Sequence, residues 1–174
     1  MPDKTNYVSI VEQKNTKPNI EDVIGGFLEG EALENAMNFV AFLRENGMNP
    51  RWSSANAWRV TGKKSKTICA INLGGAKGAH LRFLEVGDWR VCGFEGLDTK
   101  YLDEFISCEE MKGFVWANVK PCDRCCSCGP RRRTYIGKQF DECCMLSIKN
   151  PDARGLTLTK KIVEANQCYI YADA

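Results

Sequence analysis

The first third of the chain passes from a polar stretch to one long apolar stripe. Residues 1–17 are polar and show no regular spacing of apolar positions, so we expect a flexible arm there, with an edge strand as the alternative. Pro18 then opens a helical stretch, and residues 31–46 carry apolar side chains at helical spacing. These side chains are Leu33, Ala36, Met37, Phe39, Val40 and Leu43. Gly47 follows where a left-handed cap belongs, so the sequence predicts an amphipathic helix over 31–46.

From Trp52 onward the apolar positions alternate instead of following helical spacing. Short segments rich in aromatic and β-branched residues are typical of strands. Such segments are 57–61, 67–73, 80–86 and 89–94. Glycine-containing turns separate them at 62–66, 74–78 and 87–88. The sequence therefore predicts an antiparallel meander of three or four strands.

Helical spacing returns in the second half of the chain. Helices are predicted over 98–106, 109–118 and 156–167, and a short strand over 133–138. This order is typical of an α+β fold, here an antiparallel β-meander flanked by helices. We expect three parts: a flexible arm over 1–17, an α+β core domain over 18–118, and a segment over 119–174. The last part would hold a cysteine-rich metal-binding stretch and a C-terminal helix packed on the core.

Composition and charge exclude several classes of protein. The chain has 174 residues, enough for one domain with a sizeable core, and 24 Lys and Arg against 22 Asp and Glu give a net charge of +2. This balance gives no strong indication of nucleic-acid binding. No apolar run approaches the roughly 18 residues of a membrane span, and no apolar region of a secretory signal follows Met1. We expect a cytoplasmic protein whose partner is a small molecule or a protein, with no membrane contact.

Ten cysteines are the unusual feature of this composition. Six of them fall between Cys122 and Cys144, whereas a disulfide framework usually spreads its cysteines across the fold. Two pairs are adjacent in sequence, Cys125 with Cys126 and Cys143 with Cys144, and adjacent cysteines are awkward to bridge internally. Because no secretory signal is visible and the chain is long enough to need no covalent staples, we expect reduced thiols.

The spacing of the clustered cysteines predicts a metal site. Cys122, Cys125 and Cys128 are spaced C-x2-C-x2-C, and a C-x2-C turn brings two sulfurs to one ion. Four thiolates satisfy a tetrahedral Zn²⁺ ion. The fourth thiolate must come from elsewhere, and Cys143 and Cys144 both lie at a suitable separation.

Two alternatives to a zinc-stabilised binding module remain open. An iron–sulfur redox protein would use the same three cysteines, which match the start of a bacterial ferredoxin run. The cysteine that usually follows is missing, since position 132 is Arg, but a distant thiolate could complete the cluster. A nucleic-acid-associated zinc module would instead use Arg131–Arg133 to contact phosphates.

The ligand types favour a structural metal over a catalytic one. An all-thiolate site is closed and electron-rich, whereas a catalytic zinc keeps an open position. The single histidine, His80, has no evident partner, and no catalytic motif is visible, so the sequence favours a non-enzymatic role without deciding it. Trp52 and Trp58 are candidates to line a ligand cleft, with core packing as the alternative. Cys69 and Cys92, which alternate within strands, are expected to be buried.

The order of elements also resembles that of a known family of domains. An amphipathic helix is followed by the stretch Trp58-Arg-Val-Thr-Gly-Lys-Lys-Ser-Lys-Thr-Ile-Cys-Ala-Ile-Asn-Leu and then by His80-Leu-Arg-Phe. This layout, over roughly residues 20–118, resembles the small bacterial YdhG-like domains. The resemblance implies an α+β fold with a curved antiparallel sheet and flanking helices, and no settled function.

The tail carries a second pattern. Its parts are Trp116-Ala-Asn-Val-Lys-Pro before the first cysteine, Ile136-Gly-Lys-x-Phe before the last, and Asn150-Pro-Asp-Ala. It resembles a C-terminal extension of clostridial-type proteins in which four cysteines recur. The resemblance implies Cys122, Cys125, Cys128 and Cys144 as the ligands, with Cys126 and Cys143 as departures from the pattern that could replace one of them. We therefore expect a binding module stabilised by a structural tetra-cysteine zinc site.

Overall fold

Helices and antiparallel strands together confirm the α+β class. The computed structural model describes residues 8–62, 65–74, 84–94, 106, 108–121, 133–140 and 144–172. The helices are α1 (Ile10–Thr16), α2 (Glu21–Ile24), α3 (Gly30–Glu45), α5 (Glu109–Asn118) and α7 (Ala153–Ala172). The strands are β1 (Asn49–Ser54), β2 (Ala57–Thr61), β3 (Thr67–Leu73), β4 (Trp89–Cys92), β5 (Val119–Pro121), β6 (Arg133–Tyr135), β7 (Lys138–Phe140) and β8 (Cys144–Lys149).

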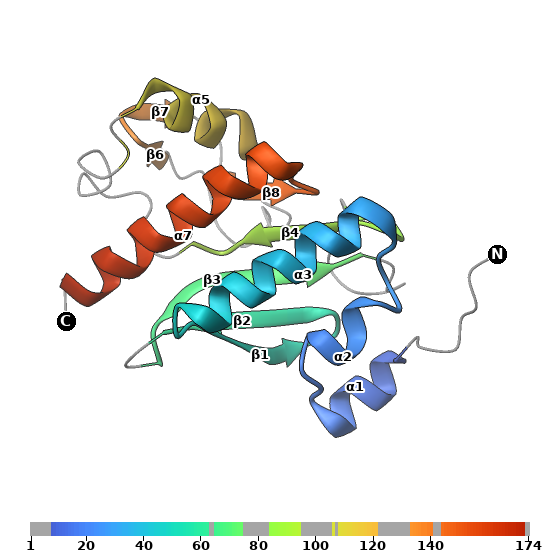
Figure 1. Ribbon diagram of the computed structural model, residues 1–174. Helices are drawn as coiled ribbons and strands as arrows, with labels where there is room; N and C mark the ends of the chain where they lie inside the picture. Colours follow the sequence, from blue (N-terminus) through green and yellow to red (C-terminus); the bar gives the residue numbers. More distant parts are fainter. Residues whose placement is uncertain are drawn as a thin grey trace.

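A six-stranded antiparallel sheet forms the centre of the fold (Figure 1). Its strand order is β1-β2-β3-β4-β8-β5, so β2, β3 and β4 follow one another as in the predicted meander. Strand β1, which was not predicted, precedes them at the edge of the sheet. Strand β8 then joins from the far end of the chain and lies between β4 and β5. Strands β6 and β7 form a separate hairpin.

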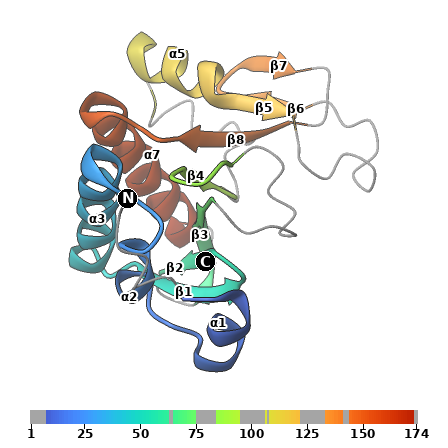
Figure 2. The same cartoon turned by 90° about the vertical axis from the view of Figure 1, so that its right-hand side faces the viewer.

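Helices α3 and α7 cover one face of the sheet (Figure 2). The buried side chains on this face follow one row across four strands, since Trp58, Ile71, Val91 and Ile148 are successive Cα partners. The ring of Phe39 in α3 packs against Trp89 of β4, with 5.9 Å between centroids. Because side chains alternate along a strand, the residues directly before and after each of these four point to the opposite face of the sheet.

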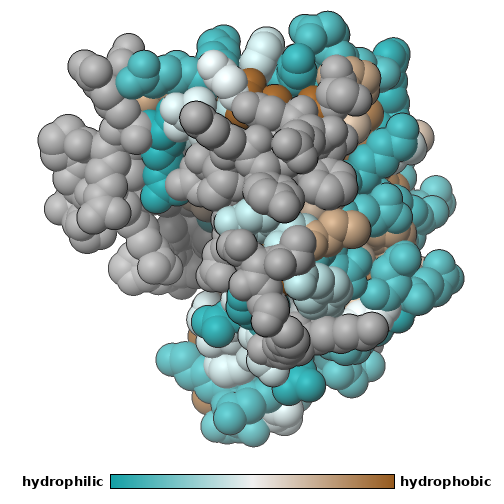
Figure 3. Space-filling model, turned by 90° about the vertical axis from the view of Figure 1, so that its left-hand side faces the viewer, coloured by the Kyte–Doolittle hydropathy of each residue, from teal (hydrophilic) through white to brown (hydrophobic). Residues whose placement is uncertain are grey.

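A second buried cluster lies where α5 and α7 meet β8. It includes Met111 and Val115 of α5, Leu146 of β8 and Ile162 of α7. Exposed apolar side chains are few among the described residues, and on the face drawn in Figure 3 the coloured surface is mostly hydrophilic. No helix in this part of the chain combines the length and the apolar character needed to cross a membrane.

Several predicted elements are confirmed. The strands at 57–61 and 67–73 and the helix at 109–118 have the predicted bounds. Helix α3 ends at Glu45, and Gly47, whose φ of 69° is left-handed, follows it as the sequence predicted. The strand expected over 133–138 is instead two strands, because Ile136 and Gly137 both have positive φ and turn the chain back. The strand expected over 80–86 and the helix over 98–106 fall mainly outside the described residues.

The flexible arm expected over 1–17 differs from the structure, in which residues 10–16 form α1. Ser9 caps this helix by accepting a hydrogen bond from the Glu12 backbone N–H. The helix is fixed by a polar side chain: Gln13 is fully buried and donates to Asn56 Oδ1 at 2.7 Å, while its Oε1 accepts from the Asn56 backbone N–H. A polar anchor has no hydrophobic periodicity, so the apolar pattern could not predict it.

Replacing Gln13 tests this anchor. We expect Gln13→Ala to lower the free energy of unfolding by about 2 kcal/mol, because the buried Asn56 N–H would lose its acceptor. Val11→Ala, at a side chain of the same helix that is 70% exposed, should cost less than about 0.5 kcal/mol. Urea denaturation measures both, and equal effects of the two substitutions would show that Gln13 is no anchor.

Candidate functional site

We call residues 122–144 the cysteine segment, and the strands at its two ends are neighbours in the sheet. Strands β5 and β8 pair antiparallel with Val119 opposite Leu146, Lys120 opposite Met145, and Pro121 opposite Cys144. Cys122 is bonded directly to Pro121, and Cys144 is the first residue of β8. The sheet therefore brings the start and the end of the cysteine segment to the same place.

The hairpin β6–β7, in the middle of this stretch of sequence, is attached to α5. Trp116 Nε1 donates to the backbone oxygen of Tyr135 at 2.8 Å, and Lys138 Nζ lies 5.4 Å from the centre of the Trp116 ring. The Tyr135 ring packs edge-on against Phe140, and Ile136 is buried. The chain between β5 and β8 is thus fixed at both flanks and at this hairpin.

Most of the predicted metal ligands lie outside the described residues. This holds for Cys122, Cys125 and Cys128, and also for the alternatives Cys126 and Cys143. Cys144 is described in its backbone as part of β8. Within the described ranges, no three His, Cys, Asp or Glu side chains gather as a metal site would require. The tetra-cysteine site and its zinc stay a prediction.

His80, Arg131 and Arg132 also lie outside the described residues. Arg133, the last of the three consecutive arginines, is partly exposed at the start of β6. The nucleic-acid alternative accordingly stays a prediction as well.

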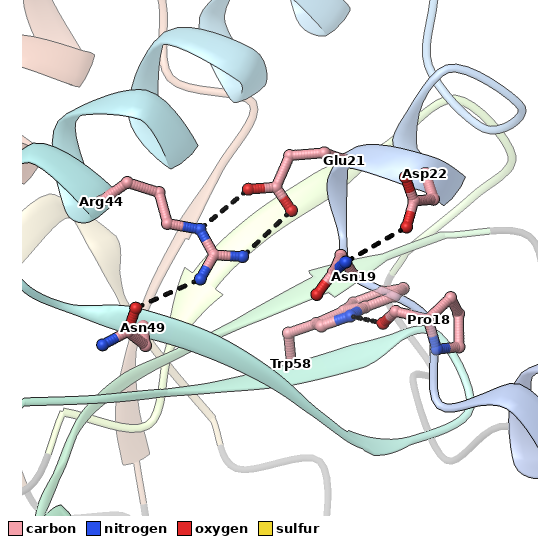
Figure 4. A network of polar contacts seen from close by, with 7 residues as sticks. All are labelled: Pro18, Asn19, Glu21, Asp22, Arg44, Asn49 and Trp58. Atoms are coloured by element: carbon pink, nitrogen blue, oxygen red, sulfur yellow. Dashed lines mark hydrogen bonds and ion pairs between the residues drawn. The ribbon is translucent and has the colours of Figure 1, made fainter.

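Trp58 lies in the core. Its side chain has 0% exposed surface, and its Nε1 donates to the backbone oxygen of Pro18 at 3.0 Å (Figure 4). Beside it, Arg44 of α3 forms a two-point ion pair with Glu21 and donates to Asn49, so that α2, α3 and β1 are tied together. The structure therefore gives Trp58 the alternative role, core packing.

Trp52 is partly buried beside the same cluster. Its Nε1 lies 3.4 Å from Oε1 of Gln13, at the polar anchor of α1. With Trp58 fully enclosed, neither indole N–H is turned toward an open space, because both have acceptors within the protein. Neither the hollow at β4, β5 and β8 nor the one at the α5–α7 junction is lined by Trp52 or Trp58. The expected ligand cleft therefore stays a prediction for Trp52 alone.

A hollow of about 320 Å³ lies on the sheet face turned away from α3 and α7. It is lined by residues of β4, β5 and β8 and their neighbours: Leu84, Arg90, Asn118, Lys120, Pro121, Met145, Ser147 and Lys149. Met145, Ser147 and Lys149 alternate along β8 with the buried Leu146 and Ile148, which places them on this opposite face. A second, more open hollow involves Phe114, Arg154 and Leu158 at the α5–α7 junction.

The cations of the first hollow are held in different ways. Arg90 is 5% exposed, and its Nε donates to Asn72 Oδ1 at 3.1 Å, the oxygen that also accepts from Cys92. Lys120 Nζ donates to the backbone oxygen of Ala117 at the end of α5. Lys149 Nζ pairs with Asp88 Oδ2 at 2.7 Å.

Asp88 also connects the start of β4 with the end of β8. Burial would raise the pKa of its carboxyl, but hydrogen bonds from Lys149, the Glu85 backbone N–H and the Asn150 amide outweigh burial and lower the pKa below its usual value. Asn150 completes the link, because its Oδ1 accepts from the backbone N–H of Trp89. This group of contacts fixes the end of β8 to the start of β4.

The hollow was not predicted from the sequence. The alternation over residues 145–149 is a strand signal that could have placed three lining side chains of the hollow, Met145, Ser147 and Lys149, on one face. Nothing in the sequence, however, indicates that this strand pairs with both β4 and β5, and this pairing creates the hollow.

Comparisons with known proteins add no relative. Neither the models of known families nor the curated proteins nor the solved structures give a significant match to this chain. The resemblance to the YdhG-like domains and to the clostridial-type extension therefore stays an expectation drawn from the sequence.

Thiol reactivity tests the placement of the described cysteines. Burial raises the pKa of the Cys69 thiol well above its usual value, with the nearby Cys92 thiol as the second cause, whereas Cys108 and Cys168 are exposed. During a short treatment of the folded protein with iodoacetamide at pH 8, we expect Cys108 and Cys168 to be alkylated and Cys69 and Cys92 to be protected. Peptide mass spectrometry measures this. Labelling of Cys69 at the rate of Cys168 would contradict the fold.

The link at Asp88 predicts a dependence on pH. Because its pKa is lower in the folded chain than in the unfolded one, Asp88 stabilises the fold above the unfolded pKa of about 3.9, and this stability is lost as the pH falls through the folded pKa. Asp88→Asn should cost about 1 kcal/mol at pH 7 and progressively less below pH 4. Urea denaturation across pH 3–7 measures this, with the exposed Glu164→Gln as control. A cost for Asp88→Asn that does not change with pH would contradict the assignment.

Proposed function

We propose that this chain is a cytoplasmic binding module for a small molecule or a protein partner, stabilised by a structural zinc ion on Cys122, Cys125, Cys128 and Cys144. The four thiolates form a donor set that suits Zn²⁺, at about 2.3 Å from each sulfur. When bound, zinc would supply a closed structural cross-link. No enzymatic step is part of the proposal.

The pairing of β5 with β8 is the observation that carries this proposal. Pro121, the neighbour of the first ligand, lies opposite Cys144, the last one. A metal that joins the two ends therefore has little chain entropy left to overcome, because the sheet has already closed the loop between them. Ligands at this end of the paired strands β5 and β8 would let the metal hold the two strands together.

The charges of the described residues next to the segment suit a thiolate-bound metal, and they suit zinc and an iron–sulfur cluster alike. Four thiolates and one Zn²⁺ carry a net charge of about −2. Lys120 precedes the segment, and Arg133 and Lys138 lie in the hairpin β6–β7 within it. Positive side chains at these positions would offset the charge of a thiolate-bound metal.

Metal analysis of anaerobically purified protein is the decisive experiment. We expect about one zinc per chain, and we expect Cys122→Ser with Cys125→Ser to lose that zinc and to lower Tm by at least about 5 °C, because metal binding is coupled to folding. Cys108→Ser with Cys168→Ser is the matched control, since both side chains are exposed, and it should keep its zinc and its Tm.

The other outcomes reject the proposed zinc-stabilised binding module. Iron with absorption near 400 nm would establish the iron–sulfur alternative instead. If the wild type contains no metal and the double cysteine variant is as stable as the wild type, the segment binds no metal. A zinc protein that binds duplex nucleic acid with a steep dependence on salt would establish the nucleic-acid alternative.

A further inference from the structure

Two arginines lie opposite each other on the face of the sheet that is turned away from α3 and α7 (Figure 2). Arg51 of β1 and Arg59 of β2 are Cα partners, and each is followed or preceded by a tryptophan that packs on the helix-covered side, Trp52 and Trp58. Because side chains alternate along a strand, both arginine side chains lie on the other face. Both are exposed, so the two guanidinium groups share one accessible stretch of surface beside the first strand of the sheet.

No negative charge offsets this pair within the described part of the chain. The ion pairs found there join other side chains, and neither Arg51 nor Arg59 donates a side-chain hydrogen bond to another residue of that part. Like charges directly opposite each other in neighbouring strands are destabilising. A local cost of this kind, with no gain inside the described structure, is typical of a functional site.

The distribution of charge over the secondary structure isolates the pair further. The six strands of the sheet contain five basic residues, Arg51, Arg59, Arg90, Lys120 and Lys149, and no Asp or Glu. Arg90, Lys120 and Lys149 each have an acceptor within the protein. Among the described residues of these strands, Arg51 and Arg59 are therefore the cations that a ligand can reach without competing with such an acceptor.

We propose that Arg51 and Arg59 together bind a phosphorylated side chain of a protein partner. A phosphate monoester carries a charge of about −1.5 to −2 and three acceptor oxygens. Each guanidinium presents a planar fork of N–H donors that suits two such oxygens. Paired residues of neighbouring strands lie roughly 5 Å apart at Cα, so one phosphate can contact both forks. The inference names a class of partner for the proposed binding module and rests on that function, but it does not rest on the zinc.

The accessibility of the pair favours a protein partner over a free small molecule. Small ligands are usually enclosed in pockets, whereas neither of the two hollows described above is lined by Arg51 or Arg59. Two exposed cations alone attract a free phosphate weakly, because solvent screens them. A protein partner adds contacts around the phosphate. Nucleic acid spreads single charges along its backbone, so one doubly charged monoester matches two facing guanidinium groups better.

Peptide binding to the full-length protein provides the test. The probes are three fluorescein-labelled peptide mixtures with the same random flanks and a central phosphoserine, serine or glutamate. By fluorescence polarisation we expect the phosphoserine mixture to bind at least about tenfold more tightly than the serine mixture, and more tightly than the glutamate mixture, because a carboxylate offers fewer oxygens and less charge. Equal binding of the phosphoserine and serine mixtures would overturn the inference.

Substitutions at the two arginines locate the binding site. Arg51→Gln and Arg59→Gln should each weaken binding of the phosphoserine mixture about tenfold, and Arg51→Lys should weaken it less than Arg51→Gln, because lysine keeps the charge and loses the fork. Neither glutamine variant should lower Tm, since each removes a like-charge contact. Lys161→Gln, at an exposed lysine on α7, is the matched control and should bind as the wild type does. Unchanged peptide affinity in both glutamine variants contradicts the assignment.

Competition distinguishes the class of ligand. Phenyl phosphate, a small phosphate monoester, should displace the labelled peptides only at a much higher concentration than the unlabelled phosphoserine mixture does. Displacement by phenyl phosphate at the same concentration would assign the site to a small molecule and reject the protein partner. Tighter binding of a single-stranded oligonucleotide, with a steep dependence on salt, would reject it in favour of nucleic acid.

Zinc content measured on the same samples separates this inference from the proposed function. A zinc-loaded, folded wild type that shows no preference for phosphoserine overturns the arginine site and leaves the zinc-stabilised module intact. A metal-free wild type with the expected peptide preference and variant pattern supports the arginine site and rejects the zinc.

Discussion

The backbone pairing of β8 with both β4 and β5 is the constraint on which the rest of this structure depends. It joins the N-terminal meander to the C-terminal part of the chain, with Val91 opposite Ile148 and Lys120 opposite Met145. Asp88 and Asn150 fix its end through hydrogen bonds to Lys149 and Trp89. Without this strand the sheet would end at β4, and α5 would lose the surface on which it packs.

One strand serves three purposes because side chains alternate along it. Leu146 and Ile148 complete the core beneath α5 and α7, whereas Met145 and Lys149 line the hollow on the opposite face. Cys144, at its first position, marks the end of the cysteine segment. A shift in register by one residue would exchange the two faces, so the core that fixes the register also fixes the hollow and the proposed zinc site.

The hollow at β4, β5 and β8 lies beside the start and the end of the cysteine segment, where the zinc is proposed to bind. The metal would hold the chain between β5 and β8, and the hollow would offer a preformed pocket beside it. Preformation matters for affinity, because a binding site that is ordered before the ligand arrives does not use binding energy to order itself. Asn72 accepts a hydrogen bond from the buried Arg90, so this wall of the hollow is ordered without the metal.

The sequence by itself determined the elements whose burial follows a period: α3 from its apolar stripe, β2 and β3 from their alternation, and α5 with its bounds. It also determined the cysteine spacing on which the zinc proposal rests. Only the tertiary structure decided that Gln13 anchors α1, that Trp58 belongs to the core, and that β8 lies between β4 and β5. The physical reason is that the spacing of apolar residues along a segment shows which of its faces is buried, whereas polar anchors and strand order depend on partners distant in sequence. Arg90 and Lys149 become neighbours only through that strand order, and so the hollow could not be predicted from the sequence.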